Sequence, residues 1–454
     1  MARARLGNLM VPVETLNREF DGKLLLALIA AERGWRCILG GQTPMHIALP
    51  LLPRSLYFAK SARSQNRKVF EIMNAMGFGI VAQDEEALIR QSDEIYTLKH
   101  DHSAFTHVSA LFAWGDDNAE IFNRMLHDDP RPILPYGNPR ADMMRPDLRA
   151  YHKPEMDSIL DRFGEFVLFN TNFAIVNHYI PGKTRFKLSK DAPRDDSERL
   201  KKGITAHKQY LFDRFRALVP QIARGIYPRN LVIRPHPSEN HAAWQDAAAG
   251  QPNVHVIHEG SVVPWLAAAR VLLQNGCTSA VEAAAIGTPI VSYRPVASAE
   301  FDPPLPSQLS LECTDDAATV AALRAVLEGH TEQPADSGAV LRHHIAALDG
   351  PFSAERIVDF LSQNLTPRQI APPVAIGRWL EALVRHQKIW LPRRLARFYK
   401  PSATLRNEYI EHKFPPISAD YVRQRMGRFQ GVLGRFQDIR LRQMQPNIFE
   451  LVKA

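Results

Sequence analysis

The sequence has few cysteines and no long apolar run. Its three cysteines, Cys37, Cys277 and Cys313, are scattered and lack the spacing of zinc ligands, so they predict a reducing cytoplasmic compartment without a disulfide framework. No apolar run approaches the roughly 18 residues of a membrane-spanning helix. The first residues are basic but are not followed by an apolar segment, so we expect no signal peptide.

Length and charge bound the organisation of the chain. A chain of 454 residues favours two domains of ordinary size, and 45% apolar with 23% charged residues is typical of a soluble globular protein. Residues 366–454 contain 17 Lys and Arg against 6 Asp and Glu, a net charge of +11. Since the whole chain carries +8, residues 1–365 carry −3, and the basic character belongs to the C-terminal segment.

The clearest pattern of secondary structure lies in residues 231–295. Three short apolar runs, 231–233, 254–257 and 271–273, each end in polar or small residues, and a fourth, 289–293, follows a helix. Continuous aliphatic runs with helices between them predict buried parallel strands. Ligands bind beyond the carboxyl ends of such strands, which is where the first and third runs are followed by polar loops.

These two loops together predict a phosphate site. In the later loop a glycine permits a tight turn, a hydroxyl can cap the helix 280–286, and free N–H groups at the helix start attract anions. The earlier loop, RPHP, adds a fixed cation and an imidazole. The alternative is a capped helix and a histidine held between prolines for turn geometry. The candidates are Arg234, His236, Pro237, Gly276, Thr278, Ser279 and Glu282.

An acidic segment follows another predicted strand, 80–82. Asp84, Glu85 and Glu86 are adjacent, so mutual repulsion predicts a raised pKa for at least one of them. The alternative is a solvated helix start, where acids favour the helix dipole. A strand at residues 9–14, a helix and the strand CILGG predict a βαβ start, and the loop between the first strand and the helix carries Arg18 and Glu19 as further site candidates.

The ordered pair RPHP and NGCTSAVEAAAIGTPIV resembles the nucleotide-binding half of bacterial GT-B glycosyltransferases that use CMP-activated acidic sugars. Within that group the chain is most similar to the surface carbohydrate biosynthesis proteins, over residues 10–365. Further motifs of the resemblance are PVETLNREFDGKLLLALIAAERGW, DEE, GNPRADMM and FNTNFAIVN. Related Kdo and sialic acid transferases carry an acidic motif that ends in glycine where this chain has Ala87.

The resemblance implies an α/β GT-B fold with two Rossmann-like domains facing a cleft. It implies an acceptor-side domain at 1–150 and a nucleotide-sugar domain at 151–365. Asn138 and Arg140 would face the cleft, Asn170 and Asn172 would contact the donor, and Gly40-Gly41 would bring backbone close to it. Glu85, ahead of Asp84 and Glu86, would be the base or nucleophile.

The predicted function is transfer of an ulosonic acid, most simply Kdo, from a CMP-sugar to a surface polysaccharide or glycolipid. A CMP-sugar has one phosphate and the chain shows no Asp-x-Asp clamp in context, so we expect no metal and no cofactor. The histidines at 100, 102 and 107 lack the further ligands of a metal site. Two alternatives stay open: a CDP-glycerol-type polyol-phosphate transferase, and a non-catalytic scaffold of a polysaccharide assembly complex.

The segment 366–454 is predicted to be a basic helical tail, with a second basic helix at 419–444. Its aromatic and basic residues are interleaved, which is typical of helices on anionic membranes and predicts a peripheral position on the inner membrane. The alternative is that these helices pack back on the first domain. No nucleic-acid module is visible, so we expect no nucleic-acid partner. Residues 181–204 predict a mobile loop that orders over substrate.

Overall fold

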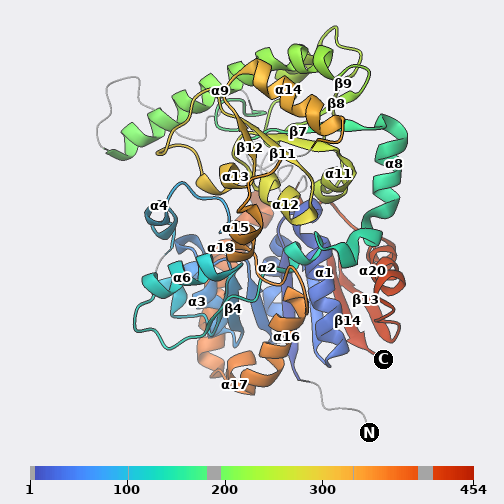
Figure 1. Ribbon diagram of the computed structural model, residues 1–454. Helices are drawn as coiled ribbons and strands as arrows, with labels where there is room; N and C mark the ends of the chain where they lie inside the picture. Colours follow the sequence, from blue (N-terminus) through green and yellow to red (C-terminus); the bar gives the residue numbers. More distant parts are fainter. Residues whose placement is uncertain (1–5, 101, 181–195, 331, 397–412) are drawn as a thin grey trace. The chain divides into compact units, whose positions relative to one another are not determined.

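The computed structural model describes residues 6–100, 102–180, 196–330, 332–396 and 413–454. They form two compact units (Figure 1). Unit 1 comprises residues 1–87, 93–151 and 342–454, and unit 2 comprises residues 88–92 and 152–341. Unit 1 is therefore built from both ends of the chain, and unit 2 is inserted between them. The predicted loop at 181–204 lies largely outside the described residues.

Unit 1 is a sheet of eight strands in the order β13-β14-β2-β1-β3-β4-β5-β6. Strands β1 to β6 are parallel, and β14 pairs antiparallel with β2 and with β13. The strands are β1 Asn8–Val13, β2 Arg36–Gly41, β3 Leu56–Ala59, β4 Gly79–Gln83, β5 Leu111–Phe112, β6 Ile133–Leu134, β13 Ile439–Gln445 and β14 Ile448–Lys453. The helices and 3-10 turns are α1 Leu16–Glu32, α2 Gln42–Ala48, η1 Leu49–Leu51, η2 Ser64–Asn66, α3 Arg67–Ala75, α4 Asp93–Thr97, α5 His102–Phe105, α6 Asp116–Met125, α7 Pro139–Asp142, η3 Pro146–His152, α16 Ser353–Asn364, α17 Pro367–Ile370, α18 Ile376–Ala396 and α20 Ala419–Leu433. Helix α15 Ser337–His344 crosses from unit 2 into unit 1.

Unit 2 is a parallel sheet of six strands in the order β12-β11-β10-β7-β8-β9. The strands are β7 Phe166–Asn170, β8 Asn230–Arg234, β9 Val254–Val256, β10 Val271–Gln274, β11 Ile290–Tyr293 and β12 Leu311–Cys313. The helices are α8 Lys153–Phe163, α9 Asp196–Ile226, α10 Ala242–Ala248, α11 Val262–Ala268, α12 Thr278–Ile286, α13 Pro304–Gln308 and α14 Asp316–Leu327. The four apolar runs predicted as strands are β8 to β11, and their parallel pairing confirms the interpretation.

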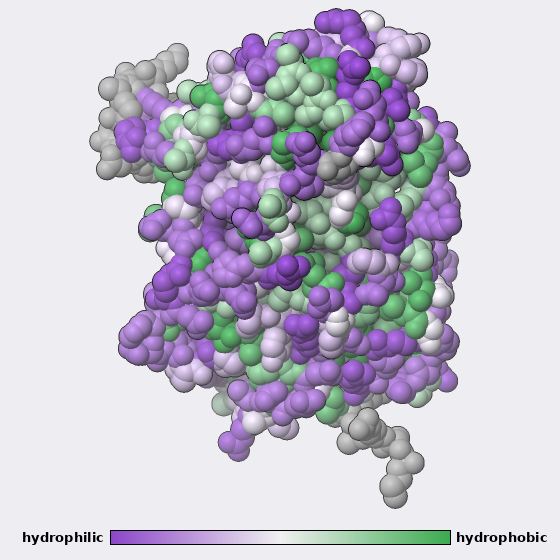
Figure 2. All heavy atoms as spheres, viewed as in Figure 1, coloured by the Kyte–Doolittle hydropathy of each residue, from purple (hydrophilic) through white to green (hydrophobic). Residues whose placement is uncertain are grey.

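The core of unit 1 surrounds α1, which carries an almost continuous apolar run from Leu24 to Ala31, all buried. Helices α16 and α20 and strands β2 and β14 all contact this helix. A helix that is apolar on every side needs such neighbours all round it. On the face drawn in Figure 2, hydrophilic residues predominate and apolar ones form small patches.

The C-terminal segment differs from the prediction in one respect. Helix α20 ends at Leu433, where Gly434 adopts a left-handed conformation, and residues 439–453 form the β13–β14 hairpin rather than a continued helix. The hairpin turns at Asn447 and extends the sheet next to β2. Phe429 and Phe436 of this segment are buried in the core of unit 1. This part of the segment therefore packs back on the first domain, which was the alternative to a membrane-bound helix.

The close approach of the hairpin also explains Gly40. A Cβ at that position would lie 2.2 Å from the carbonyl oxygen of Asn447. The small residue therefore makes room for the β14 backbone. Gly40 and Gly41 belong to strand β2 rather than to a loop, and their approach to a donor stays a prediction.

Candidate functional site

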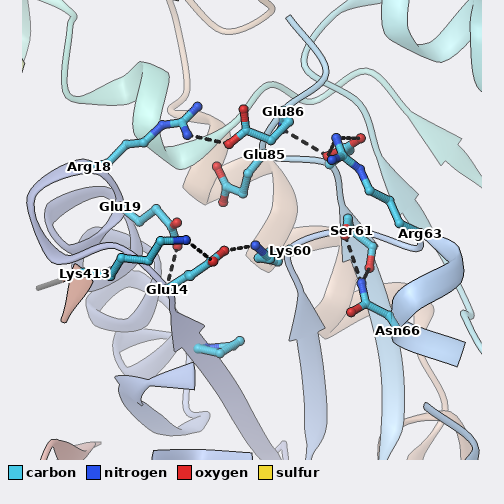
Figure 3. A network of polar contacts seen from close by, with 12 residues as sticks. Glu14, Arg18, Glu19, Lys60, Ser61, Arg63, Asn66, Glu85, Glu86 and Lys413 are labelled. Atoms are coloured by element: carbon cyan, nitrogen blue, oxygen red, sulfur yellow. Dashed lines mark hydrogen bonds and ion pairs between the residues drawn. The ribbon is translucent and has the colours of Figure 1, made fainter. Parts of the chain in front are cut away.

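Two polar clusters lie where parallel strands end, one in each unit. The cluster of unit 1 forms beyond the carboxyl ends of β1, β3 and β4, and Figure 3 shows its carboxylates and cations converging from these strands and from the C-terminal segment. The cluster of unit 2 lies beyond β7, β8 and β10. This is the edge of a parallel sheet at which ligands bind.

Asp84 begins the acidic segment and is fully enclosed. Its carboxylate accepts two hydrogen bonds of 3.0 Å from Arg63 and one of 2.9 Å from the Tyr96 hydroxyl, and His100 Nε2 lies 3.3 Å away. Burial alone would raise the pKa of Asp84, but His100 and Arg63 outweigh it and hold the pKa well below its ordinary value. Asp84 is thus a fixed anion that holds its neighbours in place, and His100 helps to keep it ionised.

Glu86 is also neutralised. It forms an ion pair with Arg18, and this charge lowers the pKa of Glu86 although burial acts in the opposite direction. The expectation of a raised pKa from mutual repulsion is therefore wrong for Asp84 and Glu86. The reason is that each of these carboxylates has its own cation, which a sequence of three consecutive acids does not reveal.

Glu85 lies in the interior of the cluster. Its carboxylate is 3.4 Å from Lys23 Nζ, accepts a hydrogen bond of 3.2 Å from Asn138 Nδ2 and is 4.0 Å from Arg140 Nη1. Lys23 also donates to Glu19 at 2.8 Å and to the Pro12 carbonyl at 2.8 Å. Burial lowers the pKa of Lys23, but Glu19 and Glu85 together raise it above its ordinary value, so the buried lysine is a cation.

All four predicted cleft candidates gather in this cluster. Arg18 pairs with Glu86, and Glu19 pairs with Lys23. Asn138 caps α7 by accepting a hydrogen bond of 2.8 Å from the Arg140 backbone N–H. The Arg140 guanidinium stacks on Trp114 with 5.1 Å to the ring centroid. Their proximity to Glu85 is a finding, whereas their contact with a substrate stays a prediction.

A second group of charges adjoins Glu85, and its two lysines were not predicted from the sequence. Glu14 pairs with Lys60, which follows β3, and with Lys413 at 2.8 Å (Figure 3). Burial, followed by the charge of Lys413, lowers the pKa of Lys60. The C-terminal segment therefore contributes a cation to a cluster whose other members lie within the first 140 residues, and no local pattern around residue 413 could indicate this.

In unit 2 the RPHP loop is held by its own neighbours. The Arg234 guanidinium donates to the backbone carbonyls of Glu259 and Gly260 at 2.6 and 3.3 Å and lies 4.8 Å from the Trp265 ring centroid. Burial lowers the pKa of Arg234 to about 10. These hydrogen bonds hold the loop at 259–260. Arg234 therefore has a structural role in addition to the phosphate contact that the sequence predicts.

The backbone of His236 is fixed by a buried acid that the sequence analysis missed. Glu239 accepts hydrogen bonds from Thr171 Oγ1 and the Phe173 N–H, both at 2.8 Å, and from Trp244 Nε1 at 2.9 Å. The His236 N–H lies 3.4 Å from the same carboxylate. His236 and Pro237 therefore stand at the end of β8 on a rigid loop.

The second loop of unit 2 begins with Gly276, whose φ of +84° favours glycine. Helix α12 starts at Thr278 and its N-cap is Cys277, which makes no side-chain capping bond. The prediction that Thr278 or Ser279 caps the helix is therefore wrong by one or two positions. Ser279 Oγ instead lies 2.6 Å from Cys277 Sγ, and Glu282 is buried in the helix.

Polar atoms without partners collect beside this loop. Asn275 is buried, and within the described part of the chain neither its Oδ1 nor its Nδ2 has a hydrogen-bond partner; the same holds for Asn170 Oδ1. Buried Lys208 of α9 donates to the Asn275 carbonyl at 3.2 Å, and burial lowers its pKa. Asn172 donates to the Gly276 carbonyl at 3.3 Å. Buried amides rarely remain unpaired, so these atoms are available to a ligand.

A cavity of about 450 Å³ adjoins the same loop in unit 2. Pro303, which lines it, would be 3.4 Å from a Cβ at Gly276. Asp302, a second lining residue, pairs with His207 at 2.7 Å, next to Lys208 in the chain. The unpaired amides and this cavity therefore belong to one region of the surface.

Within the described residues, no three or more His, Cys, Asp and Glu side chains form a group that could hold a metal ion. None of the helices described is long and apolar enough to cross a membrane.

No protein-family model matches the chain, and no curated protein matches it. Solved structures do. A variant of the wall teichoic acid polymerase TagF aligns with a TM-score of 0.50 and 9% identity over 79% of this chain and 88% of that one. A putative UDP-N-acetylglucosamine 2-epimerase from Listeria monocytogenes aligns with a TM-score of 0.49 and 13% identity, over 82% of this chain and 100% of that one. The UDP-GlcNAc 2-epimerase of Methanocaldococcus jannaschii aligns with a TM-score of 0.47 and 14% identity, over 78% of this chain and 99% of that one.

Identities this low show the fold alone. The fold is GT-B, with two Rossmann-like units, as predicted from the sequence.

Proposed function

We propose that this protein is a glycosyltransferase that takes its sugar from a nucleotide-activated donor held by unit 2. The observation that carries the proposal is the cluster of Asn275, Asn170 and Lys208 at the carboxyl ends of β7 and β10. Unpaired buried amides beside a buried lysine are suited to the ribose, base and phosphate of a nucleotide. The fixed turn at Gly276 leaves room for the ligand's close approach.

The donor we propose is a CMP-activated ulosonic acid, most simply Kdo, and the acceptor is a surface polysaccharide or a glycolipid. The resemblance of the RPHP and NGCTSAVEAAA motifs to CMP-sugar transferases supports this choice. A CMP-sugar carries a single phosphate, whose charge one lysine and the start of α12 can balance. We therefore propose that the reaction needs neither metal nor cofactor and that the donor is a substrate.

In the proposed reaction, Glu85 takes the proton of an acceptor hydroxyl. The hydroxyl oxygen then bonds to the anomeric carbon of the sugar, and CMP leaves with the electron pair of the bond that breaks. Asp84 and Glu86 are each held by a cation of their own, Arg63 and Arg18. Glu85 shares Lys23 with Glu19 and lies farther from it, at 3.4 Å against 2.8 Å, so we assign this step to Glu85. In a variant of the scheme Glu85 attacks the anomeric carbon itself and a covalent intermediate forms.

Two alternatives lead to different products. A CDP-glycerol-type transferase would move a polyol phosphate, and the fold shared with a wall teichoic acid polymerase is compatible with it; phosphorus in the product would identify it. A non-catalytic scaffold of a polysaccharide assembly complex would bind nucleotide without turning over any acceptor.

Nucleotide preference is the first test. The melting temperature of the protein is measured with CMP, CDP, UMP, UDP and GDP, since a ligand that binds only the folded state raises it. CMP should stabilise most, and Asn275→Ala should remove the shift while Asn364→Ala, which changes an exposed amide, keeps it. Stabilisation by UDP or GDP instead would overturn the donor assignment.

Catalysis is tested with Glu85→Gln. Glutamine keeps the size of the side chain and can still accept from Asn138, so CMP should bind as in the wild type while sugar transfer falls by about 100-fold or more. Glu328→Gln, at an exposed position, is the matched control and should transfer normally. Undiminished turnover by Glu85→Gln would exclude Glu85 as base or nucleophile.

A further inference from the structure

Helix α18 carries an exposed apolar stripe. Ile376, Leu380, Val384 and Leu391 are 80, 51, 54 and 45% exposed. At 3.6 residues per turn they fall within an arc of about 80° on the helix surface. Single exposed apolar side chains are ordinary, but four in line on one helix mark an interaction surface.

The face of α18 next to the stripe is anchored to unit 1. Ala382, His386 and Trp390 are buried there, and the helix contacts α3. His386 Nε2 donates to the His46 carbonyl at 2.7 Å, and the Trp390 ring meets the His46 imidazole edge-on at 5.8 Å. The helix is thus held in place, and the exposed stripe cannot turn inward without breaking these contacts.

The rest of the exposed surface of α18 is basic. Arg378, Arg385 and Lys388 lie on the arc between the stripe and the packed face, and none forms an ion pair with a residue that the structure describes. Glu381 on the same side leaves a net charge of +2. Packed face, apolar stripe and basic face thus follow one another around the helix.

We infer that α18 docks unit 1 on an anionic lipid bilayer. The stripe would enter the boundary between head groups and acyl chains, and the three cations would contact acidic head groups. Charge selects this occupant, because a second copy of the chain would bring the same cations to the contact and be repelled. A nucleic acid would satisfy the cations but leave the apolar stripe in water.

This surface differs from the one expected from the sequence. The sequence suggested aromatic residues interleaved with basic ones along the whole segment 366–454. In the structure Trp390 and Phe429 are buried. Within the described residues 366–396 and 413–454, the large exposed apolar side chains are aliphatic and lie on α18, whereas Phe398 and Tyr399 lie outside the described residues. The inference does not depend on the proposed transferase activity, since binding to lipid is measured without nucleotide or acceptor.

The test is co-sedimentation of the full chain with lipid vesicles. The protein should bind phosphatidylcholine vesicles that contain phosphatidylglycerol, bind phosphatidylcholine alone weakly, and dissociate as salt is raised. Leu380→Ser combined with Val384→Ser should weaken binding on the order of tenfold per side chain, and Arg385→Gln combined with Lys388→Gln roughly fivefold per charge. Leu98→Ser, at an apolar position that is 83% exposed, is the matched control and should bind normally.

The altered side chains are exposed, so all variants should keep the wild-type melting temperature, which is checked first. Equal binding to both kinds of vesicle would overturn the role of charge. Unchanged binding of the serine double variant, or an equal loss in Leu98→Ser, would overturn the role of the stripe. A wild-type dimer that the serine double variant converts to a monomer, without vesicle binding by either, would assign the stripe to a second copy instead.

Discussion

Asp142 joins two parts of unit 1 that are more than 200 residues apart in the sequence. Its carboxylate accepts hydrogen bonds from the backbone N–H groups of Ser353 at 2.7 Å and Ala354 at 2.9 Å, at the start of α16. The side chain is fully buried. The last residue of α7 therefore acts as the cap of a helix that begins after the whole of unit 2.

Replacing Asp142 by alanine leaves both of these N–H groups without an acceptor. A buried donor left unpaired costs about 1–3 kcal/mol, and loss of a helix cap costs about 0.5–2 kcal/mol. We therefore expect Asp142→Ala to lower the free energy of unfolding of unit 1 by about 3 kcal/mol. Asp142→Asn keeps an acceptor oxygen and removes the buried charge, so at neutral pH it should cost less.

The pH dependence separates the charge from the hydrogen bonds. Burial raises the pKa of Asp142 to about 7, even though the two N–H groups favour the ionised form. An acid whose pKa is higher in the folded protein than in the unfolded chain holds an extra proton between the two values. Stability from this group is then fully present below the unfolded pKa near 4 and is lost as the pH rises to about 7. Relative to Asp142→Asn, the wild type should lose up to about 4 kcal/mol across this window.

The assay is urea unfolding of the wild type and both variants at several pH values from 4 to 8. Tryptophan fluorescence reports on unit 1 through Trp35 and Trp114, although unit 2 contributes its own signal through Trp244 and Trp265. Amide exchange of α16 therefore assigns the change to the right unit. Equal stability of wild type and Asp142→Ala, or a difference between wild type and Asp142→Asn that stays constant with pH, would refute the reasoning.

Two further substitutions test the packing of unit 1. Lys23→Met leaves Glu19 and Glu85 buried without their shared cation and should lower the free energy of unfolding in urea by about 3–5 kcal/mol. The control Lys153→Met breaks an exposed pair with Asp157 and should lower it by less than about 0.5 kcal/mol. Similar losses in the two variants would contradict the buried-charge argument. Gly40→Ala should speed amide exchange throughout β14, because the new methyl group meets the hairpin backbone, while Gly377→Ala in α18 meets nothing within 4 Å and should leave exchange in β14 unchanged.

The parallel strands could be predicted because each is a short, uninterrupted aliphatic run followed by polar residues. The cluster around Glu85 could also be anticipated, because the loops that carry its members follow the ends of parallel strands at one edge of one sheet. These members are Arg18, Glu19, Asn138 and Arg140.

Contacts between distant residues could not be predicted. Lys23 is a charged residue at the start of an apolar helical run. Nothing near it in the sequence indicates that it pairs with Glu85. Lys208 lies on an amphipathic helix whose polar face would normally be solvated. In the hairpin, the alternation of Ile439 and Leu441 indicates a strand, but the basic residues that continue from α20 favoured a longer helix.

The pairing of β14 with β2 has a consequence for synthesis of the protein. Unit 2 is nearly continuous in the chain, so it can fold as soon as residue 341 has left the ribosome. Unit 1 must wait, because α16, α20 and β14, which cover α1, are made after unit 2. The apolar surface of α1 and the open edge of β2 are thus exposed on the nascent chain while unit 2 is made. We expect this half to depend on ribosome-associated chaperones and to be the half that aggregates when synthesis stops early.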